Sequence, residues 1–148
     1  MSEGLTVLLA EDNDGHAALI KRRFRRLGVA RRLMRFVDGA EILDFLFGQS
    51  QTGTSEAHWE PDGRYALLLD INLPKVDGIE VLRRIRREPG MKDLTVIMLT
   101  TTDDPHDIST CRALGCDEYV VKPIGAKPFA DAVLSIGNML AEREAAEA

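Results

Sequence analysis

The sequence is poor in the residues that cross-link small secreted proteins and bind soft metals. It has 2 cysteines and 3 histidines among 148 residues. Cys111 and Cys116 lack the CxxC spacing of zinc and redox motifs. Neither a disulfide framework nor a zinc site is therefore expected, and we interpret both cysteines as small apolar residues of the core.

Long hydrophobic runs and an excess of positive charge are missing as well. No apolar run approaches the roughly 20 residues of a membrane-spanning helix, and no charged-then-apolar leader opens the chain. The net charge of −5 argues against general affinity for nucleic acid. Hydrophobic residues make up 45% and charged residues 29%, which suits one soluble domain with a proper core. We therefore expect a cytoplasmic protein that contacts neither membranes nor nucleic acids.

The most informative stretch is a short apolar run that ends on a carboxylate. Residues 65–69 lead to Asp70, and a loop with Pro74 and Gly78 follows. An apolar run without polar alternation is typical of a strand buried on both faces of a parallel sheet. Such a strand ends at the edge of the sheet where open α/β folds bind their ligands. Asp70 is therefore predicted to be a reactive group rather than a core residue.

Three other apolar runs end on polar residues in the same way. They begin at Leu5, Thr95 and Tyr119, and the polar residues that follow them are Glu11 with Asp12, Thr100, and Lys122. If these strands are parallel neighbours of the first, one edge of one sheet gathers three carboxylates, a hydroxyl and an ammonium.

Between these runs, apolar residues recur with helical spacing. In residues 17–27 and again in 129–140 they form one stripe, as on an amphipathic helix. Asn13 or Asp14 can begin the first of these helices, and Gly28 can end it. One further strand is expected at 33–37, and further helices at 40–47, 79–88 and 105–114. Five strands alternating with five helices predict an α/β fold, doubly wound, with helices on both faces of a parallel sheet.

Two segments at the margins of this pattern are less regular. Residues 49–63 form a loop that is longer than the usual connection between a helix and a strand. Trp59 either pins this loop to the domain or anchors a partner, and we prefer the first because an exposed Trp is a liability. Residues 141–148 are helix-prone and charged, and we expect a helical or frayed tail there, beyond a core of about 5–140.

Basic residues cluster near the N-terminus. Eight of the 19 lie within fifteen positions: Lys21, Arg22, Arg23, Arg25, Arg26, Arg31, Arg32 and Arg35. They form either a solvated helix face or a docking surface for an acidic protein partner. In the second case, Lys21, Arg22, Arg25 and Arg26 are expected to flank the reactive edge.

Taken together, these features resemble the receiver domain of two-component response regulators. The likeness runs from Leu5 to about Leu140 and rests on the acidic pair, the central Asp with its downstream Pro and Gly, the strand-end Thr and the Lys-Pro pair. It implies a flavodoxin-like sheet in the order 2-1-3-4-5, which brings Glu11 and Asp12 beside Asp70. The 49–63 loop and the amino acids at 70–74 also resemble those of a narrower group, the small regulators paired with bacterial phytochromes.

A cation is expected among the carboxylates, because three such groups together repel one another. Mg²⁺ prefers oxygen ligands of this kind. No histidine joins the cluster by spacing, which disfavours zinc and copper. The resemblance implies that Asp12 and Asp70 bind the ion directly. It further implies that Glu11 acts largely through water and that Asn72 offers its backbone carbonyl.

The resemblance also implies the function. Asp70 would accept a phosphoryl group from a sensor histidine kinase, with Lys122 and Thr100 stabilising the transferred charge. Thr100 and Tyr119 would then transmit the switch to a partner. The bond between Lys122 and Pro123 is expected to be cis, as is usual in the family.

Other functions remain open at this point. A phosphohydrolase with an Asp nucleophile would need a second Asp where Asn72 stands, so a signalling protein rather than an enzyme is favoured. A degenerate receiver, used only as a binding module, would lack the Asp, Thr or Lys of the motif, and none of these is missing here. No output domain is recognisable after Leu140, so we expect a stand-alone regulator, or a phosphate sink or shuttle. Its output surface is predicted to be a homodimer contact of the fourth helix, the fifth helix and the edge strand at 118–121.

Overall fold

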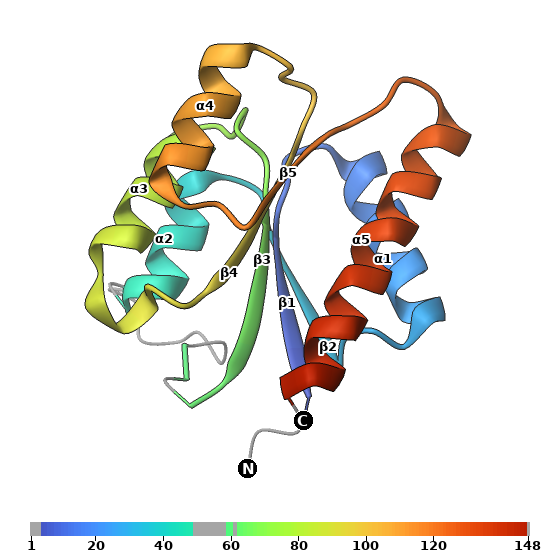
Figure 1. The fold of residues 1–148 in the computed structure, drawn as a ribbon, viewed down its shortest axis with the longest axis horizontal. Helices are drawn as coiled ribbons and strands as arrows, with labels where there is room; N and C mark the ends of the chain where they lie inside the picture. Colours follow the sequence, from blue (N-terminus) through green and yellow to red (C-terminus); the bar gives the residue numbers. More distant parts are fainter. Residues whose placement is uncertain (1–3, 49–58, 61, 148) are drawn as a thin grey trace.

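Five parallel strands form one sheet in the computed structural model, which describes residues 4–48, 59–60 and 62–147 (Figure 1). The strands are β1 (Leu5–Ala10), β2 (Arg32–Phe36), β3 (Arg64–Leu69), β4 (Thr95–Thr100) and β5 (Glu118–Val121). Their order is β2-β1-β3-β4-β5, and every neighbouring pair is parallel. The predicted order is confirmed, and β2 lies one residue earlier than expected.

Helices cover both faces of the sheet. The two on one face are α1 (Asp14–Leu27) and α5 (Ala126–Glu147), and the three on the other are α2 (Gly39–Phe47), α3 (Gly78–Arg87) and α4 (Pro105–Leu114) (Figure 1). A short 3-10 helix at Pro89–Met91 ends the α3 segment. The doubly wound arrangement is confirmed. Among the residues that the structure describes, no helix is long and apolar enough to cross a membrane.

The two faces of the sheet have separate apolar cores. Successive residues of a strand point to opposite faces, so Leu67 and Leu69 pack toward α2 and α3, whereas Leu68 packs toward α1 and α5. In β1, Leu8 and Leu9 divide in the same way. Strands buried on both sides explain the continuous apolar runs of the sequence.

Side-chain caps fix where the helices begin. Asn13, rather than Asp14, caps α1, because its Oδ1 accepts a hydrogen bond from the backbone N–H of His16 at 2.9 Å. Gly28 ends this helix with a left-handed φ of 64°. The caps of α2, α3 and α4 are Asp38, Asp77 and Asp104.

The end of α5 takes the helical form, one of the two expected for the tail. Residues 141–147 continue the helix without a break. Glu144 accepts a hydrogen bond from the backbone N–H of Leu5 at 2.9 Å, and its carbonyl oxygen accepts one from the Arg64 guanidinium at 3.2 Å. These polar contacts tie the end of α5 to the first residues of β1 and β3, and an analysis of apolar stripes could not find them.

Most of the predicted loop at 49–63 lies outside the described residues. Trp59, within the described part, is half-buried and stacks on Tyr65 with ring centroids 4.2 Å apart and 19° between the planes. Phe45 meets both rings edge-on. These contacts favour the interpretation that Trp59 pins the segment to the domain.

The two cysteines belong to the interior around α4. Cys111 is buried, Cys116 is half-buried, and both are free thiols. Burial raises the pKa of the Cys111 thiol to about 11, so that it stays protonated at neutral pH. This agrees with their interpretation as apolar core residues.

Candidate functional site

Three carboxylates gather where β1 and β3 end. Ala10 lies opposite Leu69 in the sheet, and the backbone N–H of Asp70 donates to the Ala10 carbonyl at 3.2 Å. The register therefore places Glu11 and Asp12 beside Asp70, and one oxygen from each of the three lies within 4.8 Å of the others. Glu11 and Asp70 are buried, whereas Asp12 is exposed. The predicted cluster is present.

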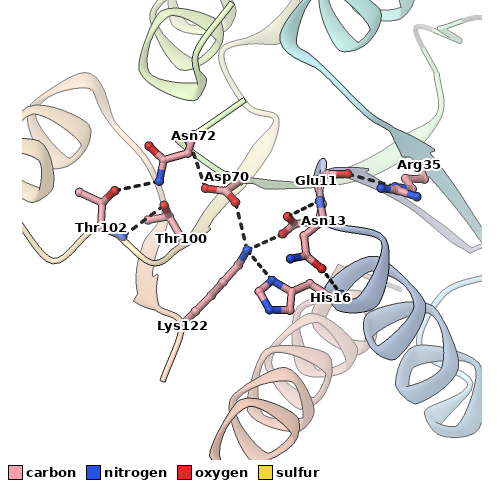
Figure 2. A network of polar contacts seen from close by, with 9 residues as sticks. All are labelled: Glu11, Asn13, His16, Arg35, Asp70, Asn72, Thr100, Thr102 and Lys122. Atoms are coloured by element: carbon pink, nitrogen blue, oxygen red, sulfur yellow. Dashed lines mark hydrogen bonds and ion pairs between the residues drawn. The ribbon is translucent and has the colours of Figure 1, made fainter. Parts of the chain in front are cut away.

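Lys122 reaches into this cluster from the end of β5. Its side chain is only 4% exposed, and Nζ lies 2.6 Å from Glu11 Oε1 and 3.0 Å from Asp70 Oδ2 (Figure 2). Its backbone N–H donates to the Thr100 carbonyl at 2.7 Å. The ammonium therefore bridges two buried carboxylates that come from different strands.

The cluster contains more negative groups than Lys122 can balance. Burial raises the pKa of Glu11 above its usual value, and the hydrogen bond and charge of Lys122 only partly oppose this effect. The available donors are carboxylate oxygens, with exposed Asp12 at the open side. This donor set fits a hard divalent cation such as Mg²⁺ and does not fit a soft one.

A tight loop holds Asp70 in place. Its Oδ1 accepts a hydrogen bond from the backbone N–H of Asn72 at 3.0 Å. A Cβ at Gly78 would lie 2.2 Å from the Asp70 carbonyl oxygen, and one at Gly39 would lie 1.8 Å from the Val76 carbonyl oxygen. Only glycine allows the loop after Asp70 to fold back this closely, which explains the Gly that follows the central Asp in the sequence.

Thr100 and Tyr119 are linked through a residue that the sequence analysis did not single out, Thr102. Thr100 is fully buried, and its Oγ1 accepts a hydrogen bond from the Thr102 N–H at 3.4 Å. The Tyr119 hydroxyl donates to the Thr102 carbonyl at 2.8 Å. Asn72 Nδ2 donates to Thr102 Oγ1 at 3.2 Å (Figure 2). The run of three threonines that starts at the last residue of β4 was the available signal for this role.

His16 lies beside the carboxylate cluster without joining it, as expected from the sequence. Its Nδ1 is 3.1 Å from Lys122 Nζ, and its ring centroid is 4.7 Å from that of Phe129 (Figure 2). His16 approaches the ammonium and not the carboxylates, so the oxygen character of the metal site is unchanged. Spacing could not reveal it, because it lies in the first turn of a helix and not at a strand end.

The basic run does not form one surface. Arg35 donates through Nε to the Glu11 carbonyl at 3.0 Å (Figure 2). It also pairs with Asp14 at 2.8 Å, so it supports the site from β2. Arg25 and Arg26 occupy the last turn of α1. At 1.5 Å per residue they lie about 16 Å along the helix from its start. The expectation that they flank the reactive edge is wrong, because α1 runs away from it.

The bond between Lys122 and Pro123 is trans, so the expectation of a cis bond is wrong. The trans isomer is intrinsically favoured even before proline. The hydrogen bond from the Lys122 N–H to Thr100 and the two ion pairs of its side chain position this residue in the trans chain.

Comparison with known proteins points the same way as the geometry. The response regulator receiver domain family matches residues 7–134. Response regulator Rcp1 from Synechocystis sp. is 30% identical over 136 residues, which cover 92% of this chain and 88% of Rcp1.

Solved structures of receiver proteins superimpose closely. A response regulator receiver domain from Rhodospirillum rubrum has a TM-score of 0.80 and 34% identity, covering 93% of this chain and 94% of that one. With the same coverage, the Mn²⁺-bound form of Rcp1 has a TM-score of 0.82 at 28% identity. The phosphorylated cyanobacterial phytochrome response regulator RcpA has one of 0.81 at 26%, also with that coverage. The chain therefore belongs to the response regulator receiver domains, the signalling modules of two-component systems.

Proposed function

We propose that Asp70 is the residue that accepts the phosphoryl group, from a sensor histidine kinase. The observation that carries this proposal is the setting of its carboxylate. It is buried at the end of the central strand, and Oδ2 lies 3.0 Å from the Lys122 ammonium. The side chains of Glu11 and Asp12 lie next to it. A buried carboxylate beside an ammonium and an acidic pair suits phosphoryl transfer, because that reaction depends chiefly on positioning and electrostatic stabilisation.

Mg²⁺ would be held by the carboxylates of Asp12 and Asp70, with Glu11 and the Asn72 carbonyl completing the ligand set. When bound, it offsets the negative charge that an incoming phosphoryl group brings to this edge. The Mn²⁺-bound form of Rcp1 supports a divalent cation in a related receiver.

The transfer itself needs few protein groups. An oxygen of Asp70 forms a bond to phosphorus while the bond from phosphorus to the kinase imidazole nitrogen breaks, and that nitrogen keeps the electron pair and takes up a proton. Lys122 stabilises the charge on the phosphoryl oxygens, since it already lies beside Asp70. The Thr100 hydroxyl donates to another of these oxygens.

Thr102 supplies a route from the phosphoryl group to the surface. When Thr100 turns toward the phosphoryl group, the contact between its Oγ1 and the Thr102 N–H changes. The Thr102 carbonyl is held by the Tyr119 hydroxyl, so the ring of Tyr119 is the next group to respond. Thr100 and Tyr119 thus act as the switch, and differential contacts with a partner in the two states provide the signal.

The relatives support a proposal for the kinase partner, and the position of β5 supports one for the output surface. RcpA is described as a phytochrome response regulator, which supports a phytochrome-type kinase as the donor. β5 is the edge strand, contains Tyr119 and offers unpaired backbone groups. We place a homodimer contact on α4, β5 and α5. Light scattering at about tens of micromolar, with and without a phosphoryl mimic, tests it, and a monomer in both states refutes it.

Labelling with a small-molecule phosphodonor tests the function. Wild-type protein should take up label with Mg²⁺ and lose this ability in excess chelator. Asp70→Asn should abolish uptake, whereas Asp103→Asn, which removes an exposed carboxylate on the loop after β4, should label normally. Undiminished labelling of Asp70→Asn would refute the proposal. A panel of phosphorylated sensor kinases would then identify the donor.

A further inference from the structure

Lys122 has a third partner that the proposed transfer does not use, the imidazole of His16. Its Nζ contacts Glu11 Oε1 at 2.6 Å, Asp70 Oδ2 at 3.0 Å and His16 Nδ1 at 3.1 Å (Figure 2). An ammonium carries three hydrogens. Each hydrogen therefore has one acceptor, and the direction of the Lys122 head group is completely determined.

The contact also determines the state of the imidazole. An ammonium can only donate, so Nδ1 of His16 must be the acceptor, the ring hydrogen must sit on Nε2, and the ring must be neutral. Burial and then the charge of Lys122 lower the pKa of His16, against the opposite influence of Asp70 and Asp12. These pKa effects agree with the geometry, because both favour a neutral ring.

His16 is held in this position by groups outside the acidic cluster. Its backbone N–H donates to the capping oxygen of Asn13 at 2.9 Å. Its ring packs against Phe129 of α5 at 45° between the planes. The imidazole is therefore fixed from two helices before Lys122 reaches it, as a preorganised acceptor has to be.

We propose that His16 is a positioning residue for Lys122, which keeps the ammonium aimed at Asp70 and thereby accelerates phosphorylation. The inference rests on the proposed role of Asp70. During transfer, Lys122 must turn from Asp70 Oδ2 to an oxygen of the phosphoryl group. A neutral acceptor on its other side holds the head group within reach and does not compete with the phosphoryl charge, as a third carboxylate would.

Three substitutions separate acceptance of a hydrogen bond from packing. His16→Phe keeps a ring against Phe129 without an acceptor, and His16→Gln restores an acceptor without the ring. His16→Ala leaves space beside a cavity of about 450 Å³ that Leu19, Lys122 and Phe129 help to line. Imidazole added to the solution can enter there and replace the missing group.

The rate of labelling by a small phosphodonor with saturating Mg²⁺ is the main readout. His16→Phe should label about tenfold more slowly, the effect of losing one hydrogen bond to a charged group. His16→Gln should stay within about threefold of wild type, since an amide oxygen accepts a similar bond. Imidazole at about pH 8, where it is neutral, should accelerate His16→Ala and leave wild type unchanged.

Each contrary result overturns the inference. Equal rates for wild type and His16→Phe would show that the hydrogen bond has no effect on the transfer. Equal losses in His16→Phe and His16→Gln would show that an acceptor at this position does not restore the rate, and no response of His16→Ala to imidazole would show the same for a free acceptor. Failure of the proposed function would give a different result. In that case the wild-type protein would take up no label, or the Asp70→Asn variant would still take it up.

An NMR titration tests the contact without any phosphorylation. The charged groups that face His16 are Lys122 after β5, Asp70 after β3 and Asp12 after β1, and α5 presents the uncharged Phe129. Lys122→Met removes the positive charge, so the pKa of His16 should rise in this variant. An unchanged pKa would overturn the contact and with it the inference.

Discussion

The carboxylates at the two ends of the sheet differ in how their charge is compensated. At the ends of β1 and β3, Glu11, Asp12 and Asp70 share one ammonium, and the burial of Glu11 is only partly compensated. At the starts of the same strands, the Glu144 carboxylate accepts a hydrogen bond from the backbone N–H of Leu5. At this end a backbone N–H satisfies the carboxylate and holds the helix to the sheet, whereas at the other end the carboxylates outnumber the one ammonium, an arrangement that suits the binding of a cation.

The largest effect should follow removal of the Lys122 ammonium. Lys122→Met leaves Glu11 and Asp70 buried without their shared partner, and breaking such a pair costs about 3 kcal/mol or more of unfolding free energy. Urea unfolding in the presence of chelator measures the loss. Added Mg²⁺ should restore part of it, because the ion replaces some of the missing charge. A variant as stable as wild type in chelator would break the contrast between the two ends.

The switch should separate from the transfer when Thr100 is truncated. Thr100→Ala retains Asp70, Lys122 and the acidic pair, so it should still take up label from a small phosphodonor. The link to Thr102 and Tyr119 is lost, and the phosphorylation-dependent change in partner affinity should disappear. Loss of labelling in a folded variant would contradict this prediction, because the transfer would then depend on Thr100.

Neutralising one glutamate at each end should change stability in opposite directions. Glu11→Gln leaves the Lys122–Asp70 pair balanced, so we expect a gain of about 1 kcal/mol without metal. Glu144→Gln weakens a charge-assisted hydrogen bond to Leu5 and should cost about 0.5 kcal/mol. Urea unfolding of both variants in chelator compares them, and the same sign for both would contradict the comparison.

The effect of Glu11→Gln should also depend on pH. The folded state raises the pKa of Glu11, so the unfolded state loses this proton first as pH rises. The contribution of Glu11 to the stability of the wild-type protein is therefore most favourable below about pH 4.5, the pKa of this group in the unfolded chain. This contribution is lost as pH rises through the higher pKa of the folded state. The gain from Glu11→Gln should be small in acid and grow toward neutral pH.

The smallest effect should come from the basic residues of α1. Lys21 and Arg22 lie nearer the site than Arg25 and Arg26, which occupy the last turn. Reversal of the first pair to Glu should slow transfer from the cognate kinase a few-fold, mainly through the association rate and less at high salt. Reversal of the second pair is the matched control and should have less effect. Equal slowing with a small-molecule donor would indicate a folding defect.

The sequence was sufficient for the residues at strand ends. Asp70, Thr100 and Lys122 each follow a short apolar run, and parallel strands bring such ends to one edge. The order of the strands could not be derived from periodicity and came from the resemblance to receivers. Once that order is known, the neighbourhood of Glu11 and Asp70 follows from the register.

Contacts made by helix side chains could not be predicted in the same way. His16 meets Lys122 across 106 positions, and Glu144 meets Leu5 across 139. Both contacts depend on how α1 and α5 pack against the sheet, and neither residue stands out in the pattern. Arg35 was hidden among eight basic residues, although it alone of these donates to the Glu11 carbonyl among the described contacts. Periodicity identifies which face of a helix is buried, and not which polar side chain reaches across the fold.

The central claim is that Asp70 itself carries the phosphoryl group. Mass spectrometry of wild-type protein, treated with a phosphodonor and Mg²⁺ and trapped with borohydride before digestion, locates the modified residue. The account predicts one modification, at Asp70, that is absent without donor and absent in excess chelator. A modification at Asp12, at Glu11 or at a histidine, with Asp70 unmodified, would contradict it.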